Sequence, residues 1–357
     1  MNNSTLHGLQ QDAIALLKQL IATPSFSKEE NDTAELIGRF FDDHGIPFSR
    51  IGNNIYAKNK NYHADKQSIL LNSHHDTVKP NKGYTNDPFQ PVEKDGKIFG
   101  LGSNDAGGCL VSLMATFLHY YPQEDLNHNV VFAASAEEEI SGVNGIELVL
   151  PYLGQIDFGI VGEPTRLGMA VAERGLMVID CTAFGRAGHA ARNEGENALY
   201  KAMEDIDWIR NYHFERISGL LGESRMSVTV IETENKQHNV VPSQCKFVID
   251  VRVNELYSFD EILESLKQNL KSQFKPRTTR MKSTSISLDH PLVEAGIALG
   301  KNYFGSPTTS DKALMPFPAL KMGPGDSARS HTADEYIYIE EINEGIKTYI
   351  DLLNQLV

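Results

Sequence analysis

Short apolar runs alternate with amphipathic stretches in the first half of the chain. The runs SILLNS (68 to 73), NVVFAAS (129 to 135) and FGIVG (158 to 162) have the length of strands and are bounded by polar residues. Stretches at helical spacing, such as 106 to 121 and 143 to 150, lie between these runs. Strands that alternate with helices predict an α/β domain, in which a mostly parallel sheet is covered by helices.

A further helix is predicted near the beginning of the chain, after residue 27, from a signal at its start. Ser27 is followed three residues later by Glu30 and then by apolar residues at helical spacing. This pattern predicts a capping box, in which both side chains satisfy backbone N–H groups at the helix start. The pair is therefore interpreted as part of the scaffold.

The order of elements changes after about residue 174. The patterns predict, in order, a strand at 176 to 184, a helix at 197 to 214, strands at 226 to 232 and 245 to 253, a helix at 259 to 271 and a strand at 278 to 288. This β-α-β-β-α-β order is typical of a ferredoxin-like α+β fold. We therefore expect a catalytic domain of residues 1–173 and 285–357, with residues 174–284 as an inserted domain.

Composition and charge exclude several classes of function. The 357 residues have a formal net charge of -14 and no basic tract, which disfavours a nucleic-acid or anionic-lipid partner. No apolar run is long enough for a membrane span, and the first twenty residues do not resemble a secretory signal. The expected location is the cytoplasm. Cys109, Cys181 and Cys245 are far apart and are expected to be reduced and structural.

Five motifs with carboxylates or histidines follow predicted strands. They are LLNSHHDTV with His74 and Asp76, FGLGSNDAGG with Asp105, AASAEEEISG with Glu137 to Glu139, IVGEPT with Glu163, and GPGDSARSHTADEY with His331. In open α/β sheets, ligands bind outside the carboxyl ends of the strands. Imidazole and carboxylate groups together suit zinc, cobalt or manganese. The set therefore predicts a metal site at one edge of the sheet.

The ordered series HHD, GLGSNDAGG, AEEE, GEPT, GRAGHAA and SHTADEY resembles the dinuclear zinc aminoacylase and carboxypeptidase superfamily. Within it, the chain is most similar to the acetylornithine deacetylase and succinyl-diaminopimelate desuccinylase branch. The resemblance implies a zinc-exopeptidase-like catalytic domain and an inserted dimerisation domain, and therefore a homodimer. It also implies two divalent metal ions, zinc in the first place and cobalt as an alternative.

The resemblance also implies a role for each motif. Asp105 would bridge both metals, with His74 and Glu163 completing one site and Glu139 and His331 completing the other. Asp76 would orient His74, and Glu138 would be the general base. Because three glutamates are adjacent, a shift of one residue would make a different member of Glu137 to Glu139 the base.

Four residues of the inserted domain match positions of the family that contact the substrate. His189 in GRAGHAAR would stabilise the oxyanion from the partner subunit, although a histidine after a glycine turn can also be an ordinary surface residue. Arg252, Asn239 and, more weakly matched, Arg174 would bind the α-carboxylate of the substrate. A salt-bridged strand arginine and a turn-forming asparagine are the alternatives for Arg252 and Asn239.

The function expected first is metal-dependent hydrolysis of the amide bond of a small N-acyl amino acid. The motifs favour N-acetyl or N-succinyl ornithine or citrulline, which would place the protein in arginine biosynthesis. A succinyl-diaminopimelate desuccinylase or a dipeptidase is the alternative with the same machinery. An inactive homologue that binds metal as a scaffold is the alternative from another class.

Overall fold

The computed structural model describes residues 3–192 and 194–357 and contains two compact units. The first unit comprises Met1–Val171, Ile286–Phe304 and Ser310–Val357. The second comprises Ala172–Ser285 and Gly305–Thr309. Each unit has a hydrophobic core of its own.

A large sheet forms the centre of the first unit. Its strands are β1 (Phe48–Ile51), β2 (Asn54–Lys58), β3 (Ser68–His74), β6 (Asn129–Ser135), β7 (Phe158–Val161), β8 (Met169–Glu173), β16 (Tyr303–Ser306) and β17 (Ala319–Lys321). Strand β15 (Thr284–Ser285), whose residues belong to the second unit, pairs with the last two residues of β8. The strand order is β1-β2-β6-β3-β7-β17-β8-β15, with β16 paired to β8. The four central strands, β6, β3, β7 and β17, are parallel, whereas β1, β2 and β8 join antiparallel at either side. The predicted mostly parallel sheet is confirmed for this centre.

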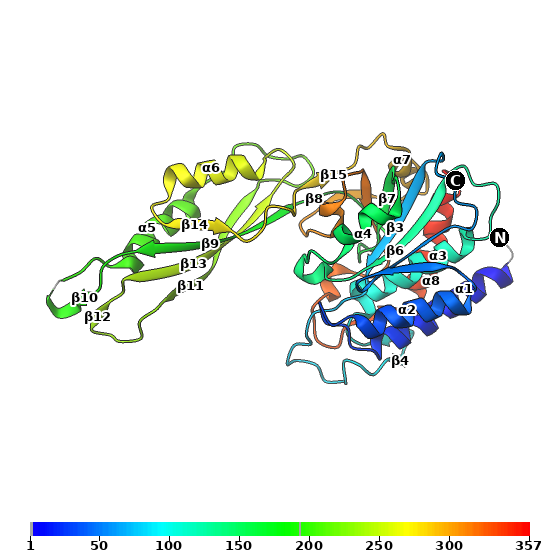
Figure 1. Cartoon of the computed structure of the whole chain (residues 1–357), viewed down its shortest axis with the longest axis horizontal. Coiled ribbons are helices and arrows are strands. Elements are labelled where there is room, and N and C mark those ends of the chain that lie inside the picture. The colour runs from blue at the N-terminus through cyan, green and yellow to red at the C-terminus, as the bar shows by residue number, and fades with distance from the viewer. Residues whose placement is uncertain (1–2, 193) are drawn as a thin grey trace. The chain divides into compact units, whose positions relative to one another are not determined.

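Helices cover both faces of the sheet because its central strands are apolar on both sides. In β3, Ile69 and Leu71 belong to one core cluster and Leu70 to another. The first face packs against α1 (Asn3–Ile21), α2 (Asn31–Asp43), α3 (Gly108–Tyr120), α7 (Pro291–Ala298) and α8 (Ile339–Leu353). The other face packs against α4 (Ile146–Leu153). Figure 1 shows three helices of the first face, α1, α2 and α3, together beside the sheet.

A small sheet lies between loops of the first unit. Its strands are β4 (Val92–Lys94), β5 (Lys97–Phe99) and β18 (Tyr336–Tyr338), in the order β18-β5-β4. Tyr336 pairs with Phe99, which brings the end of the loop that contains His331 next to the segment that leads to Asp105. The small sheet therefore connects the two chain segments that carry His331 and Asp105.

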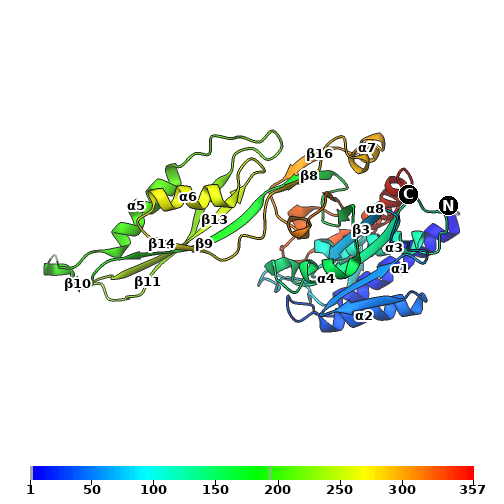
Figure 2. The same ribbon diagram turned by 45° about the horizontal axis from the view of Figure 1, so that its top comes forward.

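The second unit has the predicted ferredoxin-like fold. Its elements are β9 (Gly175–Phe184), β10 (Gly188–His189), α5 (Ala198–Asn211), β11 (Arg225–Thr233), β12 (Val240–Val241), β13 (Gln244–Val253), α6 (Phe259–Asn269) and β14 (Gln273–Pro276). The main sheet is antiparallel in the order β11-β13-β9-β14. Apolar residues of α5 and α6 pack on the alternate, buried residues of β9 and β13, so both helices cover the same face (Figure 2).

The last strand of this fold is not where the sequence placed it. The predicted strand at 278 to 288 is wrong, because β14 occupies Gln273–Pro276 instead. Phe274 of β14 packs against the core of the second unit, and this contact selects the earlier segment. Within 278 to 288, Thr284 and Ser285 pair with β8, so these residues leave the ferredoxin-like sheet.

The predicted capping box at Ser27 and Glu30 is also wrong. Helix α2 begins at Asn31, and no side chain caps its start. Ser27 donates to the carboxylate of Asp76 at 2.6 Å, and buried Glu30 accepts the backbone N–H of Glu137 at 3.1 Å. Both side chains therefore contact candidate site motifs and not the start of the helix: Ser27 contacts the motif with Asp76, and Glu30 contacts the motif with Glu137 to Glu139.

Two expectations about the whole chain can be compared with the described residues. Cys109, Cys181 and Cys245 are free and buried, as expected. Within residues 3–192 and 194–357, no helix combines the length and the apolar character needed to cross a membrane.

Candidate active site

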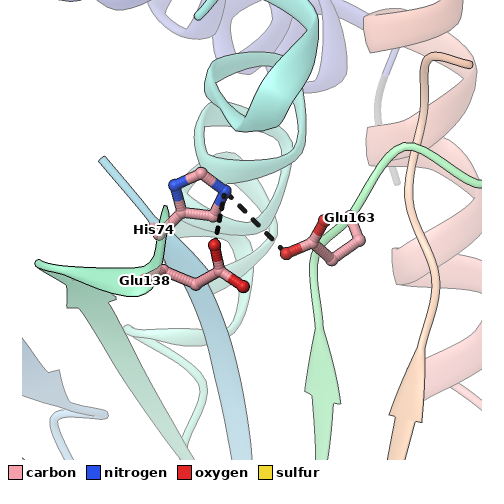
Figure 3. A group of neighbouring side chains, drawn as sticks. All are labelled: His74, Glu138 and Glu163. Carbon is pink, nitrogen blue, oxygen red and sulfur yellow. Dashed lines mark ion pairs between the residues drawn. The ribbon is translucent and has the colours of Figure 1, made fainter. Parts of the chain in front are cut away.

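The ends of three parallel strands bring the first site residues together. His74 is the last residue of β3, Glu138 follows β6, and Glu163 follows β7. Strand β3 lies between β6 and β7 and is parallel to both, so all three carboxyl ends are at the same edge of the sheet. Figure 3 shows the side chains of His74, Glu138 and Glu163 pointing toward one another.

The distances in this group fit a metal site. Nε2 of His74 is 3.8 Å from Oε1 of Glu163 and 3.9 Å from Oε2 of Glu138. The three side chains can each offer one ligand atom within 4.8 Å of the others. One imidazole nitrogen and two carboxylate oxygens are a donor set that suits zinc and its neighbours among the transition metals.

Asp105 faces both halves of the cluster. Its Oδ1 is 3.4 Å from Nε2 of His74, and its Oδ2 is 3.6 Å from Nε2 of His331. His331 is also 3.0 Å from Oε2 of Glu139. His74, Asp105 and Glu139 form a second group whose ligand atoms lie within 4.8 Å of one another. This arrangement allows one carboxylate to bridge two cations.

Four carboxylates share this volume with little access to water. The side chains of Asp105, Glu138, Glu163 and Glu139 are 13%, 12%, 11% and 8% exposed. Burial and the carboxylates of Asp105 and Glu139 raise the pKa of Glu163 to about 8, and burial raises the pKa of Glu138 well above its usual range. Carboxylates that must ionise here need compensating positive charge, which bound cations would supply.

The carboxylates of the cluster also change the pKa values of His74 and His331. Burial alone would lower the pKa of His74, but the surrounding carboxylates raise it well above its usual range. A hydrogen bond to Glu139 raises the pKa of His331 to about 9. A metal ion at either Nε2 would take the place of a proton, since metal binding requires the neutral imidazole.

Asp76 connects the first histidine to the acidic turn. Nδ1 of His74 is 3.0 Å from the backbone oxygen of Asp76 and 3.4 Å from its Oδ1. The carboxylate of Asp76 also accepts the backbone N–H groups of Glu138 at 3.0 Å and Glu139 at 3.2 Å. A donor at Nδ1 leaves Nε2 free to face the cluster, as is common for histidine ligands of metals.

The three glutamates of the acidic motif point in different directions. Glu137 has a left-handed backbone (φ 54°), and its carboxylate accepts from the side chain of Asn144 at 2.9 Å. A side chain at Gly142 would collide with Glu137, since an added Cβ would lie 2.0 Å from its carboxylate oxygen. Glu138 and Glu139 instead join the two groups around His74.

Two buried carboxylates near the cluster were not assigned from the sequence. Asp311, in the one-turn helix Asp311–Leu314, accepts from Ser135 at 2.5 Å, and burial raises its pKa to about 7. Glu335 accepts three backbone N–H groups from the turn that contains Asp105. Glu335 lies in the motif SHTADEY, four residues after His331, so its place in this motif is a sequence signal for a role near the site.

The remaining predicted residues belong to the second unit. Exposed His189 lies in β10, which pairs with β12, and the N–H of Ala190 donates to the backbone oxygen of Asn239 at 3.0 Å. His189 and Asn239 are therefore close together. Arg252 donates two hydrogen bonds to Asp250, two residues earlier in β13, at 2.8 and 3.1 Å. Arg174 donates to the backbone oxygen of Leu221.

Two comparisons of the sequence with known proteins give matches over most of the chain. Residues 70–355 match the model described as Peptidase family M20/M25/M40. A succinyl-diaminopimelate desuccinylase of Rickettsia bellii (strain OSU 85-389) is 25% identical over 375 residues, covering 94% of this chain and 95% of that protein.

Two solved structures share the fold. An M20 family metallo-carboxypeptidase from Sulfolobus solfataricus has a TM-score of 0.77 at 16% identity, covering 96% of this chain and 98% of that one. A dinuclear metal binding peptidase of the M20 family from Bacillus subtilis has a TM-score of 0.73 at 15% identity, covering 97% and 98% of the two chains. At these identities the likeness shows the fold alone.

Proposed function

Because the chain belongs to peptidase family M20/M25/M40, we propose that it uses two divalent metal ions to hydrolyse the amide bond of an N-acylated amino acid. The family match confirms the resemblance inferred from the sequence, and with it the class of metal-dependent amidohydrolase. The observation that carries the proposal is the convergence of imidazole and carboxylate ligands around His74 and Asp105.

In this proposal Asp105 is the shared ligand of two metal ions. His74 and Glu163 would complete one site, and Glu139 and His331 the other. Zinc is the proposed metal, with cobalt as the alternative, because the ligands are nitrogen and oxygen. When bound, such cations polarise an amide carbonyl and make an attacking water more acidic.

Glu138 is the proposed general base and acid. Its carboxylate takes a proton from the attacking water, the water oxygen bonds to the carbonyl carbon, and Glu138 returns the proton to the amine as the C–N bond breaks. Asp76 supports both groups, because it accepts the N–H of Glu138 while it contacts His74.

The second unit is proposed to bind the substrate. His189 would donate to the oxyanion, and Asn239 lies close enough to act at the same place. Arg252 and Arg174 would bind the α-carboxylate, for which Arg252 would exchange its pairing with Asp250. These four roles rest on matched motif positions.

For the substrate, the R. bellii relative favours the desuccinylase alternative over the ornithine or citrulline substrates expected first from the sequence. We propose succinyl-diaminopimelate as the first candidate. N-acetyl or N-succinyl derivatives of ornithine or citrulline are the second candidate, because the segments GEPT, GRAGHAAR and HTADEY resemble those of acetylornithine deacetylases. The protein would act in arginine biosynthesis only if one of these second candidates is its substrate.

Steady-state kinetics on zinc- or cobalt-loaded protein test this proposal. The panel contains succinyl-diaminopimelate, the acetyl and succinyl forms of ornithine and citrulline, and simple dipeptides. We expect kcat/KM for the preferred succinyl substrate to exceed that for its acetyl analogue by at least about 100-fold, because a pocket that pairs a second carboxylate rejects ligands without it. Turnover of dipeptides alone would contradict the deacylase proposal, and no turnover at all would favour the inactive scaffold.

We also propose that the chain is a homodimer formed through the second unit. Strand β11 is one edge of its sheet, and Val230 and Ile231 are 49% and 48% exposed there. Helix α5 packs next to β11 and exposes Tyr200 and Met203 by 64% and 53%. An open strand edge beside exposed apolar side chains favours pairing with a second copy.

Met203→Glu is expected to weaken this dimer. In a twofold interface each substitution occurs twice. If each copy costs about 1.4 kcal/mol of binding free energy, which is tenfold in Kd, the two together weaken association by about 100-fold. Light scattering after size-exclusion chromatography should show a shift from twice the mass of one chain toward the mass of one. Ile217→Glu is the matched control, because Ile217 is 68% exposed but lies outside α5 and β11. A monomeric wild type would end the dimer proposal.

A further inference from the structure

We propose that Glu335 is a positioning residue that holds the Asp105 turn and the His331 loop in one arrangement. This inference rests on the proposed function, because it assigns Asp105 and His331 to one metal centre. Glu335 itself is not a proposed ligand, and its side chain acts through hydrogen bonds to backbone groups.

The first contact is with the turn that carries Asp105. Oε1 of Glu335 accepts the N–H of Asn104 at 2.8 Å and of Asp105 at 2.9 Å, while Oε2 accepts the N–H of Gly102 at 3.1 Å. Gly102 has a left-handed backbone (φ 73°), which turns these N–H groups toward one point. Successive N–H groups in such a turn form a binding site for an anion. The carboxylate of Glu335 fills it.

The second contact is with the loop that carries His331. Glu335 is four residues after His331 in the chain, and its backbone oxygen accepts the N–H of Gly100 at 2.9 Å. His331 has a left-handed backbone (φ 59°), which a residue other than glycine rarely adopts. Such a conformation persists only where surrounding contacts hold it. Glu335 supplies one of these contacts, because it ties the end of the loop to the segment that leads to Asp105.

The burial of Glu335 explains why a carboxylate is required. The residue is 2% exposed, so its charge depends on hydrogen bonds from the turn rather than on water. Glutamine has the same shape but only one acceptor oxygen. Its amide nitrogen would face a backbone N–H that now donates to Glu335, so one N–H of the turn would lose its partner.

Glu335→Gln is the decisive variant, with Glu335→Ala as a more severe one. Apoprotein is titrated with Zn²⁺ or Co²⁺, bound metal per chain is counted, and the visible absorption of Co²⁺ reports the geometry around it. We expect metal affinity to fall by about 10- to 100-fold, as is typical for partners that orient metal ligands. The Co²⁺ spectrum should change, and kcat should fall more than KM rises.

Asp334→Asn is the matched control. Asp334 precedes Glu335 in the loop, but its carboxylate accepts from the N–H groups of Thr85 and Asn86 and does not contact the Asp105 turn. We expect this variant to keep wild-type metal affinity and an unchanged Co²⁺ spectrum.

The outcomes separate this inference from the proposed function. Wild-type metal affinity and spectrum in Glu335→Gln, even with a lower Tm, would overturn the positioning role and leave the metal centre intact. A wild-type protein that binds fewer than two metal ions and cleaves no amide of the panel would remove the proposed function, and this inference with it.

Discussion

Glu138→Gln is expected to bind two metal ions and to lose about 100- to 10,000-fold in turnover, the usual contribution of general acid-base catalysis. Glutamine keeps the size of the side chain but cannot take a proton from water. Glu138 is not one of the proposed metal ligands, and glutamine occupies the same space beside His74, so metal affinity should change little. Measurement of kcat together with metal content per chain checks both parts.

The neighbouring glutamate provides the control for Glu138. The carboxylate of Glu137 is held by Asn144 and does not join the groups around His74, so Glu137→Gln should keep most of the activity. Full activity in Glu138→Gln together with loss of activity in Glu137→Gln would shift the assignment by one residue. Loss of a metal ion from Glu138→Gln would make Glu138 a ligand instead of the base.

Asp105→Ala is expected to reduce the metal content below two ions per chain and to lower turnover by more than about 1,000-fold. The two oxygens of Asp105 face His74 and His331 separately, so its removal would take one ligand from each proposed site. Metal ions contribute several kcal/mol to such reactions, and about 4 kcal/mol corresponds to 1,000-fold in rate. Elemental analysis after dialysis and kcat under excess Zn²⁺ are the two measurements.

A surface aspartate serves as the control for Asp105. Asp180 is 54% exposed and pairs with Arg277, an arrangement that contributes little to stability. Asp180→Asn should therefore retain two metal ions and a rate within about 2-fold of wild type. If Asp105→Ala retained two ions with wild-type affinity, the bridging role would be wrong.

The sequence predicted the elements whose signals are local. The apolar run at 68 to 73 became β3, and the order of elements after residue 174 identified the ferredoxin-like fold. Parallel strands end at one edge of a sheet, so the sequence alone predicts that His74 and Glu163 lie close together, as they do in the structure.

The misplaced capping box has a physical cause, because a hydrogen bond to a distant segment leaves no pattern in the local sequence. Ser27 and Glu30 have the spacing of a capping box, but Asp76 and Glu137 provide partners that the spacing does not reveal. The hydrogen bonds of Glu335 leave no local pattern either, since its partners are backbone groups more than two hundred positions away.

The position of β17 in the sheet has a consequence for synthesis of the protein. Strand β17 lies between β7 and β8, although it is made after the whole second unit. Until Lys321 leaves the ribosome, β7 therefore has an unpaired edge, and His331 is not yet available to the site. The edge of β7 stays open while the second unit is made, and the proposed metal centre can form only after His331 has been synthesised.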